Sequence, residues 1–194
     1  MESSPVKSNL RMYVNDMLAV EHDLTNALNG QLADDNIKSE PDIHALLTEI
    51  LADSIARADR LKTLSDGLDG QVGAVLKEAV SSAAGTVAGW YGMVRKHPVS
   101  RMLRDDHVAL NVASLAYGML YTSALAYDHQ EIASATLSYM GTLPGQIMEL
   151  SQLIPEVVVK ELAEDYPQVD TSAIDVAKRA MLNVWMEAEA STAV

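Results

Sequence analysis

Acidic side chains that could bind a metal ion stand at four positions, Glu21, Glu49, Asp53 and Glu131. Glu21 belongs to an apolar row whose other members recur every three or four residues, or at multiples of that spacing: Leu10, Val14, Met17, Leu24 and Leu28. A charged group in such a row needs a partner or access to water. Glu21 is therefore a metal ligand, a carboxylate paired with a basic residue, or a boundary residue whose side chain reaches solvent, and the register leaves all three open.

The other three acidic residues lie beside apolar rows. Glu49 and Asp53 are one position off a second row, and Glu131 lies near the start of a later segment. That second row places a serine where a ligand would be wanted: Ile43, Leu47, Ile50, Ser54 and Leu61. We expect Glu49, Asp53 and Glu131 either to lie on solvated helix faces or to form a carboxylate-rich site together with Glu21. Oxygen ligands of this kind suit Mn, Mg or Ca better than zinc.

Di-metal sites between four helices use a Glu on two of them and Glu-x-x-His on the other two, because that spacing puts both ligands on one face. No Glu-x-x-His occurs in this sequence, and Tyr117 and Tyr121 stand where an acidic ligand could be. The GxSxG, P-loop, GxGxxG and HExxH motifs are missing too. The sequence therefore gives no positive sign of catalysis and predicts no cofactor, with iron or manganese as the alternative.

Elements that would position these residues follow from helical periodicity. Apolar residues recur three and four apart over long stretches, and no alternating strand pattern is present. The predicted helices are residues 8–31, 42–68, 72–95, 101–126, 130–165 and about 171–190. Asn29-Gly30 predicts the first helix end, Ser100 an N-terminal cap, and residues 127–129 a turn. Proline at 144 and 155 predicts bends in the fifth helix.

These elements predict one domain, residues 1–194, with a bundle core at about 8–165 and a further helix at about 171–190. The predicted class is all-α. The expected architecture is an antiparallel four-helix bundle with an extra helix between its second and third long helices and a C-terminal helix.

Three stretches resemble the bacterial ferritin-like proteins, in the broad branch that includes stress-associated and uncharacterised bundles. They are LRMYVNDMLAVEHDLTNAL as a first helix, VSRMLRDDHVALNVASLAYGMLYTSALA as a third and PGQIMELSQLIPEVVVKELAED as a fourth. The resemblance implies a ferritin-like bundle. Metal-binding members of that superfamily oxidise iron or activate oxygen at a di-metal carboxylate site. Only Glu21 matches a ligand position, which implies a degenerate site here.

Composition limits the partners. With 27 acidic and 14 basic residues the formal charge is −13, which repels nucleic acid and anionic membranes. There is no cysteine, which excludes thiolate chemistry. No apolar segment of signal type follows the first residues, so we expect a cytoplasmic protein. The most apolar run, residues 79–94, is shorter than the roughly 20 residues that span a membrane.

Three functions fit these observations. The first is a non-enzymatic, structural or stress-related bundle that self-associates as a homo-oligomer, with the C-terminal helix around Trp185 and Met186 as a candidate contact. The second is a carboxylate-rich metal-binding protein that uses Glu21, Glu49, Asp53 and Glu131. The third is a carrier of a small apolar molecule, held between the predicted helices 101–126 and 130–165, where Gly, Ala and Tyr residues such as Tyr117 and Tyr121 leave room.

Overall fold

The computed structural model describes residues 5–68 and 98–192, and all regular structure in these ranges is helical. The helices are α1 (Pro5–Leu32), α2 (Asp35–Lys38), α3 (Pro41–Gly67), α5 (Pro98–Ala126), α6 (Gln130–Asp165) and α7 (Ala173–Thr192). The predicted all-α class is thereby confirmed. The predicted helix over residues 72–95 lies outside the described residues.

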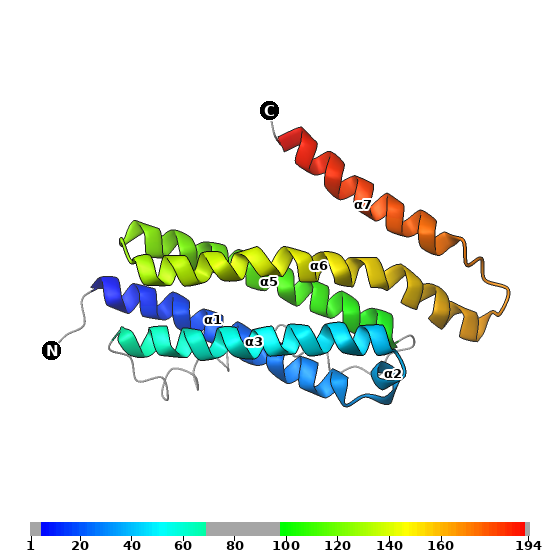
Figure 1. The fold of residues 1–194 in the computed structure, drawn as a ribbon, viewed down its shortest axis with the longest axis horizontal. Coiled ribbons are helices and arrows are strands. Elements are labelled where there is room, and N and C mark those ends of the chain that lie inside the picture. Colours follow the sequence, from blue (N-terminus) through cyan, green and yellow to red (C-terminus); the bar gives the residue numbers. More distant parts are fainter. Residues whose placement is uncertain (1–4, 69–97, 193–194) are drawn as a thin grey trace.

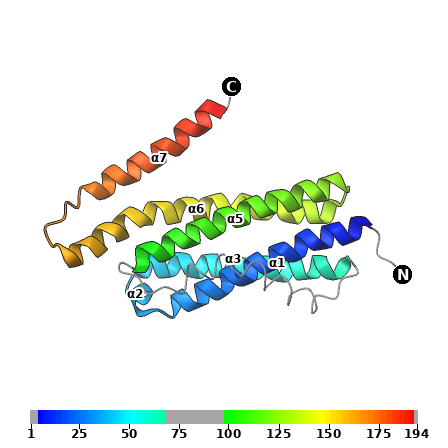
Figure 2. The same ribbon diagram turned by 180° about the vertical axis from the view of Figure 1, so that it is seen from behind.

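Helices α1, α3, α5 and α6 lie side by side (Figure 1). α1 packs on α3 and α5, while α6 packs closely on α5 and touches α3 much less. Neighbouring helices are antiparallel, and Figure 2 shows α1 and α5 together on the rear face. α3 ends at the end of the molecule opposite to the start of α5, so these two helices run parallel (Figures 1 and 2).

The apolar rows seen in the sequence form the core between these helices. The members of the two predicted rows, on α1 and α3, are all buried. Leu64 of α3 and a row of α5 are buried with them: Leu103, Leu110, Ala113, Tyr117 and Leu120. Each fully buried Leu or Ile stabilises the fold by roughly 1.5–3 kcal/mol relative to an exposed one. The helical period of the sequence therefore determines which faces meet.

Helix boundaries differ from the predictions in two places. α1 continues through Asn29-Gly30 to Leu32, and a short α2 follows, capped by Asp34, whose carboxylate accepts from the Asn36 backbone N–H at 2.8 Å. α5 begins at Pro98, so the predicted cap at Ser100 is wrong. The start of α5 is instead capped by a side chain of α6: Glu161 Oε1 accepts from the N–H groups of Val99 (2.8 Å) and Ser100 (3.2 Å).

The turn between α5 and α6 lies where it was predicted. Asp128 has φ 53°, the left-handed conformation that Asp tolerates better than most residues. α6 then runs without a break through Pro144 and Pro155 (Figure 1).

Helix α7 packs on α6 and then diverges from the other helices (Figures 1 and 2). Its apolar residues Ile174 and Met181 are half-buried, whereas Val184 and Met186 are exposed. The side chain of Trp185 lies outside the described part of the structure. The described residues therefore cover α7 only in part.

Candidate functional site

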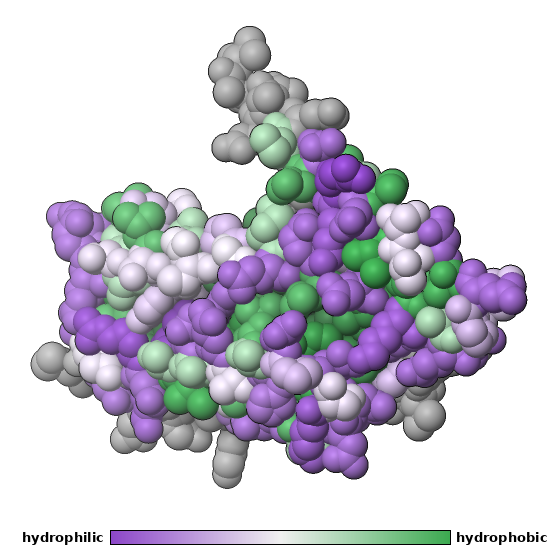
Figure 3. All heavy atoms as spheres, turned by 45° about the vertical axis from the view of Figure 1, so that its right-hand side comes forward, coloured by the Kyte–Doolittle hydropathy of each residue, from purple (hydrophilic) through white to green (hydrophobic). Residues whose placement is uncertain are grey.

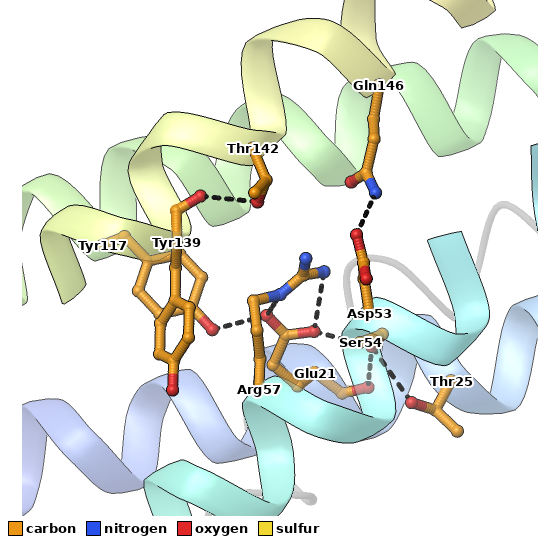
Figure 4. Close-up of polar contacts among 9 residues, drawn as sticks. All are labelled: Glu21, Thr25, Asp53, Ser54, Arg57, Tyr117, Tyr139, Thr142 and Gln146. Carbon is orange, nitrogen blue, oxygen red and sulfur yellow. Dashed lines mark hydrogen bonds and ion pairs between the residues drawn. The ribbon is translucent and has the colours of Figure 1, made fainter. Parts of the chain in front are cut away.

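Glu21 lies midway along α1 and is completely buried. Its carboxylate forms an ion pair with Arg57 of α3, which is 3% exposed. Arg57 Nε donates to Glu21 Oε1 at 2.7 Å, and Nη2 donates to Oε2 at 3.3 Å (Figure 4). Of the three roles that the sequence left open for Glu21, the structure shows pairing with a basic residue.

Two hydroxyl groups complete the surroundings of this carboxylate. Ser54 Oγ donates to Glu21 Oε2 at 2.6 Å, and the Tyr117 hydroxyl donates to Oε1 at 2.5 Å. Thr25 of α1 forms a further hydrogen bond with Ser54 at 3.1 Å. Each oxygen of Glu21 therefore accepts one charged and one neutral hydrogen bond. We call Glu21, Ser54, Arg57 and Tyr117 the Glu21 cluster.

Three helices supply the Glu21 cluster, and each does so from its core-facing row. Ser54 and Arg57 are three residues apart on α3, which places both side chains on one helical face. That is the spacing of Glu-x-x-His, with a hydroxyl in place of the carboxylate and a guanidinium in place of the imidazole. Tyr117 reaches Glu21 from the middle of α5.

The pKa values of Arg57 and Tyr117 are both raised, which keeps both side chains protonated. Burial lowers the pKa of Arg57, but the charge of Glu21 and its hydrogen bonds outweigh burial and leave that pKa above its ordinary value. Burial, reinforced by the charge of Glu21, raises the pKa of Tyr117 far above its ordinary value. The Tyr117 ring also packs on Tyr139, with centroids 5.5 Å apart at 58°. Tyr117 is therefore a permanent hydrogen-bond donor.

A second group of polar contacts joins α3 to α6, and we call it the α3–α6 seam. Gln146 donates to Asp53 at 2.8 Å, and Arg60 donates to Glu131 at 2.8 Å. Nearer the start of α3, Lys160 pairs with Glu40. Arg60 and Glu131 are 43% and 62% exposed, so solvent surrounds their ion pair.

The four predicted metal ligands do not share one site. Glu21 belongs to the Glu21 cluster, Asp53 and Glu131 have separate partners in the α3–α6 seam, and Glu49 is exposed. Among residues 5–68 and 98–192, no group of three or more His, Asp or Glu side chains is placed to hold a metal ion. The donors around Glu21 do not fit a metal either, because a guanidinium and two hydroxyl groups already occupy both carboxylate oxygens.

Sequence reasoning missed Arg57 and Gln146. Arg57 carries a detectable signal, since it is a basic residue three positions after Ser54 on the otherwise apolar face of α3. Gln146 carries none that distinguishes it from a surface glutamine. Both bury a polar atom with no hydrogen-bond partner, Arg57 Nη1 and Gln146 Oε1. Figure 4 shows both side chains directed into the space between α3 and α6.

Cavities lined by described residues open on the surface away from the Glu21 cluster. One, of about 230 Å³, lies between α1 and α3 and is lined by Leu18, His22, Thr25, Ile55, Ala58, Asp59 and Lys62. Another, of about 120 Å³, lies between the start of α3 and α6, where Ile43, Leu153 and Val157 meet Glu40 and Lys160. Neither is lined by Tyr117 or Tyr121.

No family model, curated protein or solved structure matches the chain.

Proposed function

We propose that this protein is a non-enzymatic ferritin-like bundle with a structural or stress-related role, that it self-associates, and that the Arg57 guanidinium holds the place of a metal ion. The connection between helices supports the ferritin-like part. α3 and α5 are parallel and joined across the length of the molecule, and one long crossover of this kind distinguishes ferritin-like bundles from simple up-and-down ones.

The observation that carries the non-enzymatic part is the saturation of the Glu21 carboxylate by Arg57, Ser54 and Tyr117. A divalent ion at Glu21 would have to displace a guanidinium that is buried and charged. Expelling Arg57 from its ion pair leaves that charge without a partner, which is costly in a protein interior. The bundle is held at this point by an organic cation that has no redox chemistry.

Metal content tests this proposal directly. Full-length protein, purified without chelators and then exposed to Fe(II) or Mn(II), is expected to hold less than about a tenth of a metal ion per chain. A matched double variant, Ser54→Glu with Arg57→His, restores Glu-x-x-His beside Glu21 and is expected to gain metal. Adding Glu21→Gln to that variant should reduce the gain. Wild-type protein that retains close to one or more ions per chain would contradict the proposal.

A second candidate function is the binding of a small neutral molecule at the α3–α6 seam. The buried Arg57 Nη1 is a donor and the buried Gln146 Oε1 an acceptor, and neither has a hydrogen-bond partner among residues 5–68 and 98–192. Figure 3 shows hydrophobic residues in a hollow below α7, at the level where α6 passes above α3 in Figure 1. Arg57 is already neutralised by Glu21 and lies near Asp53, so this environment favours a neutral hydroxyl compound over an anion.

Titration with a matched pair of probes tests the second candidate. Cyclohexanol is expected to shift the NMR signals of the Gln146 side-chain amide and the Arg57 Nε–H group, whereas cyclohexanecarboxylate at the same concentration should shift neither. Signals that stay unchanged with cyclohexanol would remove this candidate and leave an ordered water molecule as the bridge between the two groups.

A further inference from the structure

The outward face of α5 is an apolar surface that the described residues leave exposed. Val112, Leu115 and Met119 are 45%, 74% and 57% exposed, and their spacing places them on one face of the helix. Leu137 on α6 is also exposed. Leu137 lies as many residues after the turn at Asp128 as Met119 lies before that turn. Leu137 and Met119 are therefore at the same level of the antiparallel helices α5 and α6. We call Val112, Leu115 and Met119 the α5 face.

The part of α5 that follows Asp106 also carries no formally charged side chain. Between Asp106 and Asp128 the sequence contains no Asp, Glu, Lys or Arg, although 21% of the whole chain is charged. A solvent-exposed helix face is normally polar or charged, and a contiguous exposed apolar stripe is typical of an interaction site. The α5 face therefore has the composition of a covered surface.

A lipid bilayer is a poor occupant for this face. α5 is long and apolar enough to cross a membrane by length and composition. The opposite side of α5, however, is packed in the core, where Tyr117 is fully buried and donates a hydrogen bond to Glu21. The formal charge of −13 also opposes approach to an anionic surface.

The charges at the two ends of α5 favour a second copy of this chain. Arg101 and Arg104 lie on the same side of the helix as the α5 face, at its N-terminal end, where Arg104 also forms an ion pair with Asp105 of its own chain. Asp128 is exposed just beyond the C-terminal end of α5. In an antiparallel pair of α5 helices centred on Leu115, Arg104 of one copy falls opposite Ala126 of the other. Both arginines then lie near the partner's Asp128, whereas a parallel pair would bring like charges together.

We infer that two copies pair through their α5 faces, antiparallel about a two-fold axis at Leu115. This inference rests on the self-association in the proposed function and specifies where it occurs. A two-fold contact uses the same patch on both copies, as the placement of opposite charges at the two ends requires. An interface made of one helix face from each copy buries an area at the lower limit for stable interfaces. The dimer should therefore form at concentrations on the order of micromolar.

Cysteine cross-linking tests the geometry, because the natural chain contains no cysteine. Leu115→Cys protein, treated with a short bis-maleimide, is expected to form a covalent dimer with itself. Arg104→Cys protein alone should not, since the two positions lie at opposite ends of the contact. A mixture of Arg104→Cys and Ala126→Cys proteins should give the mixed dimer. Self-cross-linking at residue 104 without mixed dimers would overturn the antiparallel arrangement.

Mass in solution tests the surface itself. Sedimentation equilibrium of full-length protein at tens of micromolar should give twice the 21.0 kDa of one chain. Leu115→Glu should give the monomer mass with an unchanged helical circular dichroism spectrum, whereas the control Val184→Glu, on the exposed side of α7, should stay dimeric. The opposite result would place the contact on α7, and would overturn the α5 contact while keeping self-association.

A monomeric wild-type chain would remove both the α5 contact and self-association. Flotation of that monomer with neutral phosphatidylcholine vesicles would instead identify lipid as the occupant of the α5 face, which also overturns the inference. Neither result bears on metal content, so the metal-free part of the proposed function is judged separately.

Discussion

The Glu21 cluster and the α3–α6 seam both join helices through charged side chains, but solvent reaches only one of them. Glu21 and Arg57 are 0% and 3% exposed, whereas Arg60 and Glu131 are 43% and 62% exposed. In the interior, an unpaired charge keeps the cost of its desolvation, while at the surface water replaces a lost partner. Ion pairs of similar length should therefore differ several-fold in the effect of breaking them.

The two regions also differ in what they specify. The Glu21 cluster links α1, α3 and α5 through atoms that fit in one register only. A shift of any of these helices would leave a buried charge or hydroxyl group without its hydrogen-bond partner. The ion pairs of the α3–α6 seam, Arg60–Glu131 and Lys160–Glu40, join side chains that solvent reaches and that can adjust. We expect the Glu21 cluster to fix the alignment of the helices, and the α3–α6 seam to contribute little to stability.

The largest expected effect comes from removing the buried cation. Arg57→Met should lower the free energy of unfolding by about 3–5 kcal/mol, because it leaves the Glu21 carboxylate buried without its counter-charge. Urea unfolding followed by circular dichroism measures the change. The double variant Glu21→Gln with Arg57→Met should recover a large part of the loss. Equal losses in the single and double variants would show that packing around Arg57, and not charge, is responsible.

A smaller effect is expected from the hydroxyl group of Tyr117. Tyr117→Phe removes a hydrogen bond to a charged group and should cost about 1.5–3 kcal/mol of unfolding free energy. Tyr121→Phe is the matched control on the same helix. Tyr121 is half-buried, and its hydroxyl has no hydrogen bond to the described residues, so a change below about 0.5 kcal/mol is expected. Similar losses in both variants would contradict the importance of the Glu21 contact.

The raised pKa of Tyr117 predicts a pH dependence that distinguishes the buried cluster from the surface. The folded protein keeps this hydroxyl protonated above pH 10, where an unfolded tyrosine ionises. The contribution of protonated Tyr117 to the free energy of unfolding is therefore complete below about pH 10. It is lost as the pH rises further, by up to about 1.4 kcal/mol per pH unit. Urea unfolding between about pH 9 and pH 11 should show a shallower decline for Tyr117→Phe than for the wild type.

The smallest effect is expected at the α3–α6 seam. Arg60→Met, made one helical turn from Arg57, should cost less than about 1 kcal/mol, and a double-mutant cycle with Glu131→Ala should give a coupling energy of about 0.2–1 kcal/mol. Added salt should reduce this coupling but leave the Glu21–Arg57 coupling nearly unchanged. A coupling at Arg60 as large as that at Arg57 would break the contrast between the two regions.

The amino-acid sequence by itself determined the helices and their buried faces. The rows of Leu, Ile and Val at spacings of three and four predicted α1, α3, α5 and α6 to within a few residues at each end. It also identified Glu21 as a charge inside a row, which is where the cluster formed. These features are local, because the period of an α-helix relates residues only a few positions apart.

Only the tertiary structure decided which partners those residues meet. Arg57 is 36 residues from Glu21 and Tyr117 is 96 residues away, so no local pattern could pair them. The same holds for Glu161, which accepts a hydrogen bond from the Val99 N–H at the start of α5 and lies 62 residues further along the chain. Partner choice depends on how the helices rotate and slide when their apolar faces pack, and the helical period alone does not specify either motion.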